Sequence, residues 1–198
     1  MILNFDAMIL LWIQETLRNP VCDSIFKFIT HLGDNGYFWI GLSLILCIFK
    51  KTRKAGIFAL VALLFSVIVN NALLKNIIGR LRPYEIIAGL ECIIKHATDA
   101  SFPSGHTGSS FAAATAYLLK LPKKISIPTL VMAFLISLSR LYVGIHYPTD
   151  VIAGAISGVA LGILACLIGE FVIKKWQEKH PKKVKVEETK TEDVKAED

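Results

Sequence analysis

Five long apolar stretches limit what this chain can fold into more than any other feature of its sequence. They cover residues 36–50, 55–74, 106–120, 125–142 and 148–173. A straight membrane-spanning helix needs about 20 residues, within a range of about 17–25, and the second and fifth stretches reach that length. The first and third are short, which predicts that flanking residues or a thin local bilayer complete those spans. The sequence therefore predicts an all-α, polytopic transmembrane helical bundle.

Composition excludes an ordinary soluble domain. Apolar residues make up 54% of the 198 residues, charged residues make up 19%, and the mean hydropathy is +0.54, whereas the outside of a soluble domain is largely polar. The formal charge of +6 raises nucleic-acid binding as an alternative, but the lysines form no patch among aromatic residues. They lie between apolar stretches and near the C-terminus, so we expect the bilayer as a partner and no nucleic acid.

The two ends of the chain differ from this core. Residues 4–18 have an apolar, helical pattern that includes Asp6 and Glu15, which is typical either of a sixth span or of a helix lying in the membrane interface. We favour the sixth span, which gives about six helices in all. Residues 177–198 alternate Lys with Glu and Asp and are predicted to be a charged, disordered tail. The membrane domain is thus predicted to cover residues 1–176.

Basic residues predict which face is cytoplasmic. Three groups follow the first, third and fifth stretches: Lys50, Lys51, Arg53 and Lys54; Lys120, Lys123 and Lys124; and Lys174, Lys175, Lys179, Lys182 and Lys183. Alternating crossings place all three groups on one face, which the positive-inside rule assigns to the cytoplasm. We therefore expect a multi-pass plasma-membrane protein with a cytoplasmic tail. Basic residues on the opposite face are costly at span ends unless they are paired or useful, which predicts an anionic ligand there.

Two groups of polar residues lie at the predicted outer ends of the spans. Lys75 and Arg82 are seven residues apart, so they share a helical face if one helix continues until Pro83 ends it. The alternative is an ordinary positive helix C-terminus. Ser104 can cap the helix that follows, and Gly105 allows close approach to the backbone. A helix start favours phosphate, although a plain capped helix with an exposed His106 is the alternative.

A third group surrounds the turn between the last two stretches. Arg140 ends one span, His146 lies just before the next, and Pro148 suits the first turn of that helix. Asp150 falls in the same turn and can reach the imidazole, where a carboxylate fixes the tautomer and leaves the other ring nitrogen free to attack. A tight turn with a capping Asp is the alternative. Together, the three groups provide the nucleophile, orienting base, acid and anion clamp needed for phosphoryl transfer through a covalent intermediate.

At these residues the sequence resembles the type 2 phosphatidic acid phosphatase (lipid phosphate phosphatase) family, which is similar in its core to the vanadium haloperoxidases. The matching residues are Lys75, Arg82 and Pro83; Pro103, Ser104, Gly105 and His106; and Ser139, Arg140, His146 and Asp150. Three motifs in order and with matching spacing make the resemblance specific. The surrounding spans extend it to most of residues 35–173, while the first 30 residues and the tail lie outside it.

The resemblance implies a role for each of these residues. His146 attacks phosphorus and forms a phosphohistidine, Asp150 holds its reactive tautomer, and His106 protonates the leaving oxygen and then deprotonates water. The residues implied to bind the phosphate oxygens are Lys75, Arg82, Ser104, Gly105 and Arg140. The sequence shows no carboxylate cluster suited to magnesium, so we expect no metal and no cofactor. Arg80 is not a motif position, and it is expected either to touch lipid phosphate or to lie at the surface.

A site at the outer membrane–water edge predicts a lipid phosphate substrate. Five apolar residues of the loop 84–100 are expected to rest on the lipid surface and admit a chain: Ile86, Ile87, Leu90, Ile93 and Ile94. They do not separate a polyprenyl from a diacylglycerol tail. By family analogy we choose undecaprenyl diphosphate, the carrier lipid of cell-wall synthesis, which would yield undecaprenyl phosphate and phosphate. Phosphatidylglycerophosphate and phosphatidate are alternative substrates. A lipid transporter without hydrolysis is the alternative of another class.

A glycine stripe in the last stretch bears on assembly. Gly154, Gly158 and Gly162 share one helix face, and small residues on such a face allow two helices to approach closely. We favour tight packing within the bundle, and a homodimer is the alternative.

Overall fold

The computed structural model describes residues 2–180, with side chains from residue 5 onward. Residues 181–198, most of the predicted tail, lie outside the described residues. The helices are α1 (Ile2–Leu17), α2 (Pro20–Leu32), the 3₁₀ turn η1 (Asp34–Gly36), α3 (Tyr37–Ile48), α4 (Arg53–Ser66), the π-helix η2 (Val67–Leu74), α5 (Lys75–Ile78), α6 (Pro83–Ile86), α7 (Gly105–Lys120), α8 (Lys123–Tyr142) and α9 (Pro148–Lys179). The all-α prediction is confirmed, and α9 continues three residues past the predicted domain boundary at residue 176.

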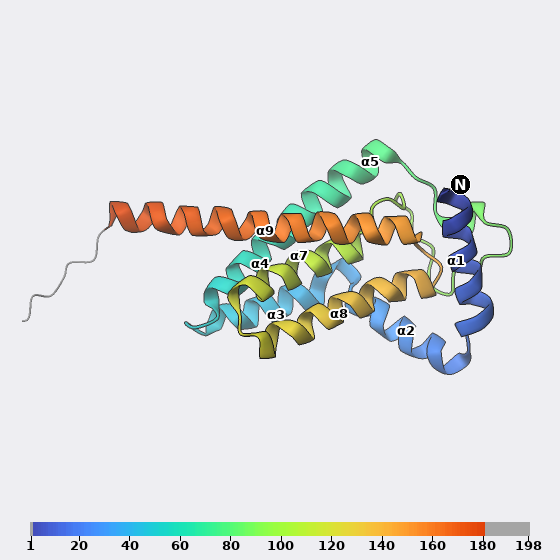
Figure 1. The fold of residues 1–198 in the computed structure, drawn as a ribbon, viewed down its shortest axis with the longest axis horizontal. Coiled ribbons are helices and arrows are strands. Elements are labelled where there is room, and N and C mark those ends of the chain that lie inside the picture. Colours follow the sequence, from blue (N-terminus) through green and yellow to red (C-terminus); the bar gives the residue numbers. More distant parts are fainter. Residues whose placement is uncertain (1, 181–198) are drawn as a thin grey trace, which may run out of the picture.

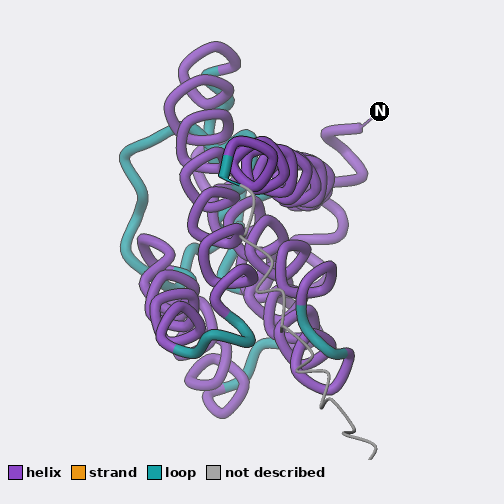
Figure 2. The backbone as a smooth tube through the Cα atoms, turned by 90° about the vertical axis from the view of Figure 1, so that its left-hand side faces the viewer, coloured by secondary structure: helices purple, strands orange, loops and turns teal. Residues whose placement is uncertain are grey.

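The long helices α3, α4, α7, α8 and α9 run along one direction and form the bundle (Figure 1). Figure 2 views several of them nearly end-on. Helix α7 lies at the centre, in contact with α4, α8 and α9. Its alanines at 112, 113, 114 and 116 are fully buried, because small side chains let neighbouring backbones approach. The indole N–H of Trp39 donates to the hydroxyl of Ser110 at 2.9 Å, which satisfies two polar groups inside this core.

The glycine stripe of α9 lies against α7. A Cβ added at Gly158 would lie 2.5 Å from the carbonyl oxygen of Gly108, and one at Gly162 would lie 2.7 Å from that of Ala112. Gly154 meets the first turn of α7 in the same way. The prediction of tight packing within the bundle is confirmed, while the homodimer stays a prediction.

Three helical segments are long and apolar enough to cross a membrane: Arg53–Ile86, Lys123–Tyr142 and Pro148–Lys179. Helices α3 and α7 have 12 and 16 residues, so the first and third apolar stretches are indeed short. Large apolar side chains cover the outside of the bundle, among them Ile45, Leu64, Val131, Phe134, Ile156 and Leu167. An outside of this kind is stable in lipid and not in water.

Helix α1 does not lie along the bundle. Figure 1 shows it crossing the end of α8 and α9, roughly at right angles to them. Phe5, Met8 and Trp12 are exposed on one side of α1, while Asp6 is fully buried on the other. This arrangement matches the interfacial alternative and not the sixth span that the pattern favoured. The reason is that Asp6 has partners beneath the helix: its carboxylate accepts hydrogen bonds from Arg80 and Thr149.

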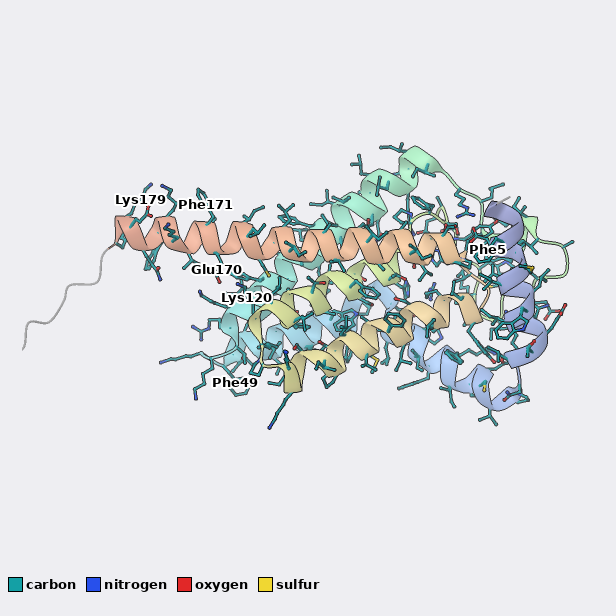
Figure 3. All side chains as sticks on the ribbon, in the orientation of Figure 1. Phe5, Phe49, Lys120, Glu170, Phe171 and Lys179 are labelled. Atoms are coloured by element: carbon teal, nitrogen blue, oxygen red, sulfur yellow. The ribbon has the colours of Figure 1, made fainter. Side chains whose placement is uncertain are left out.

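The two ends of the bundle carry different groups. Lys120 and Glu170 lie at the end remote from Phe5 (Figure 3). Glu170 accepts from Lys120 at 2.9 Å and from Lys54 at 3.2 Å. The end near α1 instead holds the residues that the three motifs single out.

Candidate active site

His146 lies between Arg82 and Asp150. Nη1 of Arg82 is 3.0 Å from Nε2 of His146, and a guanidinium only donates hydrogen bonds, so Nε2 carries a lone pair. The proton therefore sits on Nδ1, which lies 3.4 Å from Oδ2 of Asp150. Burial lowers the pKa of His146 well below its ordinary value, and the charges of Arg82, Arg140 and Lys75 act in the same direction. The imidazole is thus neutral, with a free nitrogen lone pair facing the cations.

Asp150 is fully buried and held on both oxygens. Its Oδ2 accepts from the backbone N–H of Tyr147 at 3.0 Å and from the hydroxyl of Ser101 at 2.5 Å. Pro148 opens α9, as predicted, and this first turn brings the carboxylate back toward His146. Oδ1 accepts from Arg80 at 2.6 Å. A buried carboxylate that accepts this many hydrogen bonds is held in one orientation.

Arg80 connects this carboxylate to α1. Besides Asp150, it donates to Asp6 at 2.9 Å and to Thr149 at 2.7 Å, and its guanidinium stacks 3.7 Å from the ring of Tyr147. The expectation that Arg80 lies at the surface is therefore wrong, because its guanidinium is held by protein partners; a contact with lipid phosphate stays a prediction. The motif search missed both Arg80 and Asp6; a charged residue inside an apolar helix is the signal that points to Asp6.

Lys75 and Arg82 are brought together by the carboxylate of Asp99. They do not lie on one shared helix. Helix α5 ends at Ile78, where Gly79 adopts a left-handed conformation (φ 58°), and Pro83 begins α6. The expectation of one continuous helical face ending at Pro83 is therefore wrong, because a left-handed residue stops the helix.

Asp99 holds the two cations across that break. It forms ion pairs with Lys75 and, at 2.6 Å, with Nη2 of Arg82. Although partial burial opposes ionisation, the hydrogen bond and charge of Lys75 and the charge of Arg82 lower the pKa of Asp99 to about 2. Sequence reasoning missed Asp99. Its partners Lys75 and Arg82 lie 24 and 17 positions earlier in the chain, and nothing in the segment around Asp99 marks it as their partner.

Arg140 is buried at the end of α8, as predicted. One nitrogen, Nη1, donates to the hydroxyl of Thr30. Its Nε has no hydrogen-bond partner among the described residues, and an unpaired buried N–H on a cation is costly. An oxyanion is the natural partner for such a group.

The start of α7 is built as its sequence predicts. Ser104 is the N-cap, and its hydroxyl oxygen accepts from the backbone N–H of Thr107. At Gly105 a Cβ would lie 2.5 Å from the side-chain oxygen of Asn71, so the glycine permits a close approach to η2. His106 is largely buried, and its Nε2 lies 2.9 Å from Oδ1 of Asp34. Asp34 is a further contact that the motifs do not reveal.

A cavity of about 350 Å³ opens between η1, α3, η2 and α7. Its lining includes the polar side chains of Lys75, Asp99 and His106 and the apolar side chains of Ile40, Leu63 and Val67. A cavity of this character can hold a charged head group and the first carbons of a lipid chain. Within residues 5–180, no set of three His, Cys, Asp or Glu side chains is placed to bind a metal ion.

The residues of the three motifs therefore meet at one end of the bundle. The charges of Lys75, Arg82, Arg140 and His106 act on His146, although these side chains come from four different elements. Ser104 is engaged as a helix cap, and its hydroxyl also accepts from the hydroxyl of Thr107 at 3.0 Å. What the arrangement offers chemically is a neutral nitrogen nucleophile beside a cluster of cations, with a second imidazole at the cavity wall.

Two curated proteins are similar to this chain in sequence. An undecaprenyl-diphosphatase of Sulfolobus acidocaldarius is 36% identical over 132 residues, which span 67% of this chain and 64% of that protein. The undecaprenyl-diphosphatase BcrC of Bacillus subtilis is 33% identical over 147 residues, or 74% of this chain and 75% of that one.

Solved structures are similar over most of the chain. LpxE of Aquifex aeolicus is 28% identical with a TM-score of 0.71, covering 82% of this chain and 93% of that one. The transmembrane PAP2-type phosphatidylglycerolphosphate phosphatase of Bacillus subtilis is 27% identical with a TM-score of 0.68, covering 90% and 87%. A profile of the PAP2 superfamily matches residues 55–174, which include all the motif residues, and the chain therefore belongs to the PAP2 superfamily.

Proposed function

We propose that this protein is a membrane-embedded lipid phosphatase that acts on undecaprenyl diphosphate and releases undecaprenyl phosphate and inorganic phosphate. The observation that carries the proposal is the pairing at His146, whose Nε2 lies 3.0 Å from Arg82 and whose Nδ1 lies 3.4 Å from Asp150. This leaves a neutral imidazole with its lone pair among cations. The names of the Sulfolobus and Bacillus relatives support the choice of substrate.

In the first half of the proposed reaction, Nε2 of His146 attacks the terminal phosphorus as Arg82 turns from the imidazole to a phosphate oxygen. The N–P bond forms and the P–O bond to the lipid breaks. A proton from His106 goes to the leaving oxygen. Arg140, whose Nε is free of protein partners among the described residues, binds a nonbridging oxygen together with Lys75. Preorganised cations of this kind contribute several kcal/mol to lowering a barrier, about 3–4 for a single donor.

In the second half, water attacks the phosphohistidine while His106 takes its proton. The N–P bond breaks and inorganic phosphate leaves. Asp150 keeps its hydrogen bond with Nδ1 of His146 throughout, so the imidazole returns to the same tautomer. In both halves of the reaction, the side chain that gives or takes the proton is His106.

Phosphate release from a panel of detergent-dispersed lipids, with EDTA present, tests the proposal. The panel holds undecaprenyl diphosphate, phosphatidylglycerophosphate and phosphatidate, and we expect the fastest release from undecaprenyl diphosphate. Faster release from phosphatidylglycerophosphate would make that lipid the substrate instead. The similarity to the solved Bacillus phosphatase favours this second candidate. Lipid movement across vesicle membranes without phosphate release would show that the protein is a lipid transporter and not a phosphatase.

We further propose that the cavity faces the outside of the cell and that the end with Lys120 and Glu170 faces the cytoplasm. The three basic groups on the latter side support this orientation. Lys95 lies exposed in the loop between α6 and α7, and Lys51 lies exposed between α3 and α4. In a variant without native cysteines, Lys95→Cys should react with an impermeant thiol reagent in intact cells, and Lys51→Cys should react only after lysis. The reverse pattern would invert the topology.

A further inference from the structure

Asp34 belongs to none of the three motifs, yet it contacts one of the two histidines at the site. Its Oδ1 lies 2.9 Å from Nε2 of His106, and its Oδ2 lies 2.8 Å from Nδ1 of His31. It precedes the segment that matches the family profile, which begins at residue 55. The two site histidines are therefore each paired with a carboxylate, His146 with Asp150 and His106 with Asp34.

The local backbone is shaped to make this contact. Gly33 has no room for a side chain, because a Cβ there would lie 2.5 Å from Cδ2 of the His106 ring. Asn35 and Gly36 follow in left-handed conformations, with φ of 50° and 69°, which turns the chain sharply into α3. Left-handed conformations are uncommon outside glycine. The turn thus holds Asp34 at the edge of the cavity, with the imidazole of His106 packed on the preceding residue.

We propose that Asp34 is a positioning residue for His106: it accepts a hydrogen bond from Nε2–H, so that Nδ1 is the nitrogen that exchanges a proton with the leaving oxygen and with water. The inference rests on the proposed phosphatase function. A carboxylate on one ring nitrogen selects the tautomer and orients the ring, as Asp150 does for His146.

The charge of Asp34 matters as well as its position. Burial disfavours the imidazolium of His106 most, and the charges of Arg140, from α8, and Lys75, from α5, act in the same direction. Asp34 is the carboxylate that opposes them at this ring. Its hydrogen bond with His106 lowers the pKa of Asp34 to about 2, against the effect of partial burial, so it stays ionised at any working pH. It therefore favours the protonated His106 that must act as the acid.

The proton balance follows from this geometry. When phosphorus moves from the lipid oxygen to Nε2 of His146, the P–O bond breaks and Nδ1–H of His106 gives its proton to that oxygen. When water attacks the phosphohistidine, its proton goes to Nδ1, and the N–P bond breaks. His106 keeps its Nε2 proton in both steps, hydrogen-bonded to Asp34, and Asp34 is unchanged at the end.

The test compares Asp34→Asn with Asp23→Asn. Asp23 lies on α2, 11 residues away in sequence, and its carboxylate accepts a hydrogen bond from the hydroxyl of Tyr142, which an amide oxygen can also accept. Both variants lose one negative charge. The quantity measured is kcat/KM against pH, for the lipid that the wild type hydrolyses fastest and for 4-nitrophenyl phosphate, whose leaving group needs no proton.

For Asp34→Asn we expect kcat/KM on the lipid to fall about 10- to 100-fold, the lower range for loss of general acid catalysis. The loss on 4-nitrophenyl phosphate should be much smaller. The alkaline limb of the lipid profile should move down by about one pH unit, because the imidazolium loses its counter-charge. In Asp34→Glu and in Asp23→Asn, the alkaline limb of the lipid profile should lie at the same pH as in the wild type.

Equal losses on both substrates, or an unmoved alkaline limb, would overturn the role of Asp34 while leaving the phosphatase function intact. A wild type that releases phosphate from no substrate would instead overturn the proposed function. If Asp34→Asn elutes from size exclusion in detergent as an aggregate, Asp34→Ser removes the same charge with a smaller side chain and must show the same contrast between substrates.

Discussion

Nη1 of Arg82 donates to Nε2 of His146 across 3.0 Å, so the cation that is expected to bind phosphate lies against the nitrogen that is expected to attack it. The contact reveals which nitrogen has the lone pair. It also places the proposed nucleophile beside a cation proposed to bind phosphate, so Arg82 has only to turn from the imidazole to a phosphate oxygen in the proposed reaction.

His146→Gln should lower phosphate release by at least about 10³-fold, the scale seen when a covalent nucleophile is removed. Glutamine is similar in length and can keep a hydrogen bond with Arg82, so the melting temperature in detergent should change little. His180→Gln, at the exposed end of α9, is the control and should retain full activity. Unchanged turnover in His146→Gln would refute its assignment as the nucleophile.

Asp99→Asn should strengthen the binding of orthovanadate, a phosphate mimic. The carboxylate of Asp99 pairs with Lys75 and Arg82, and a pKa of about 2 keeps it ionised at every assay pH. It therefore competes with an incoming anion for the same cations. We expect the inhibition constant to fall about 10-fold, which corresponds to about 1.4 kcal/mol.

Glu91→Gln is the matched control for this measurement, since Glu91 is exposed in the same loop. Its inhibition constant should equal that of the wild type. A higher constant in Asp99→Asn would show that the carboxylate serves to hold the two cations in place and does not compete with phosphate.

Asp6→Ala should weaken the attachment of α1. Asp6 is fully buried and accepts from Arg80 and from both the backbone and the hydroxyl of Thr149. Its loss leaves those donors unpaired, at a cost of about 1–3 kcal/mol. The expected result is a lower melting temperature and partial loss of phosphatase activity, since Arg80 also holds Asp150. Glu15→Ala on the exposed side of the same helix should alter neither quantity.

Gly158→Ala should destabilise the contact between α7 and α9. The new Cβ would lie 2.5 Å from the carbonyl oxygen of Gly108, and overpacking of this kind costs about 1–3 kcal/mol. Gly41→Ala is the matched control, because no atom lies within 4 Å of a Cβ built there. In the middle of α3 that change should stabilise by about 0.5–1 kcal/mol. Equal melting temperatures of the two variants in detergent would contradict the close packing.

Several features follow from local sequence alone. The length of an apolar stretch is set by the thickness of the bilayer, so the bundle could be predicted without any contact. Ser104 as a helix cap and Asp150 in the turn after Pro148 were also predictable, because both depend on residues within a few positions of one another. The glycine stripe indicated a close helix contact for the same reason, although its partner α7 did not follow from it.

What only the tertiary structure decided is how distant charges pair. Asp34 meets His106 across 72 positions in the sequence, and Asp6 meets Arg80 across 74. No local pattern encodes such pairs, because they exist only where separate helices end at one place. The same contacts explain why α1 crosses the end of the bundle: buried carboxylates are stable only beside cations, and for Asp6 the cation lies at the site and not within a sixth span.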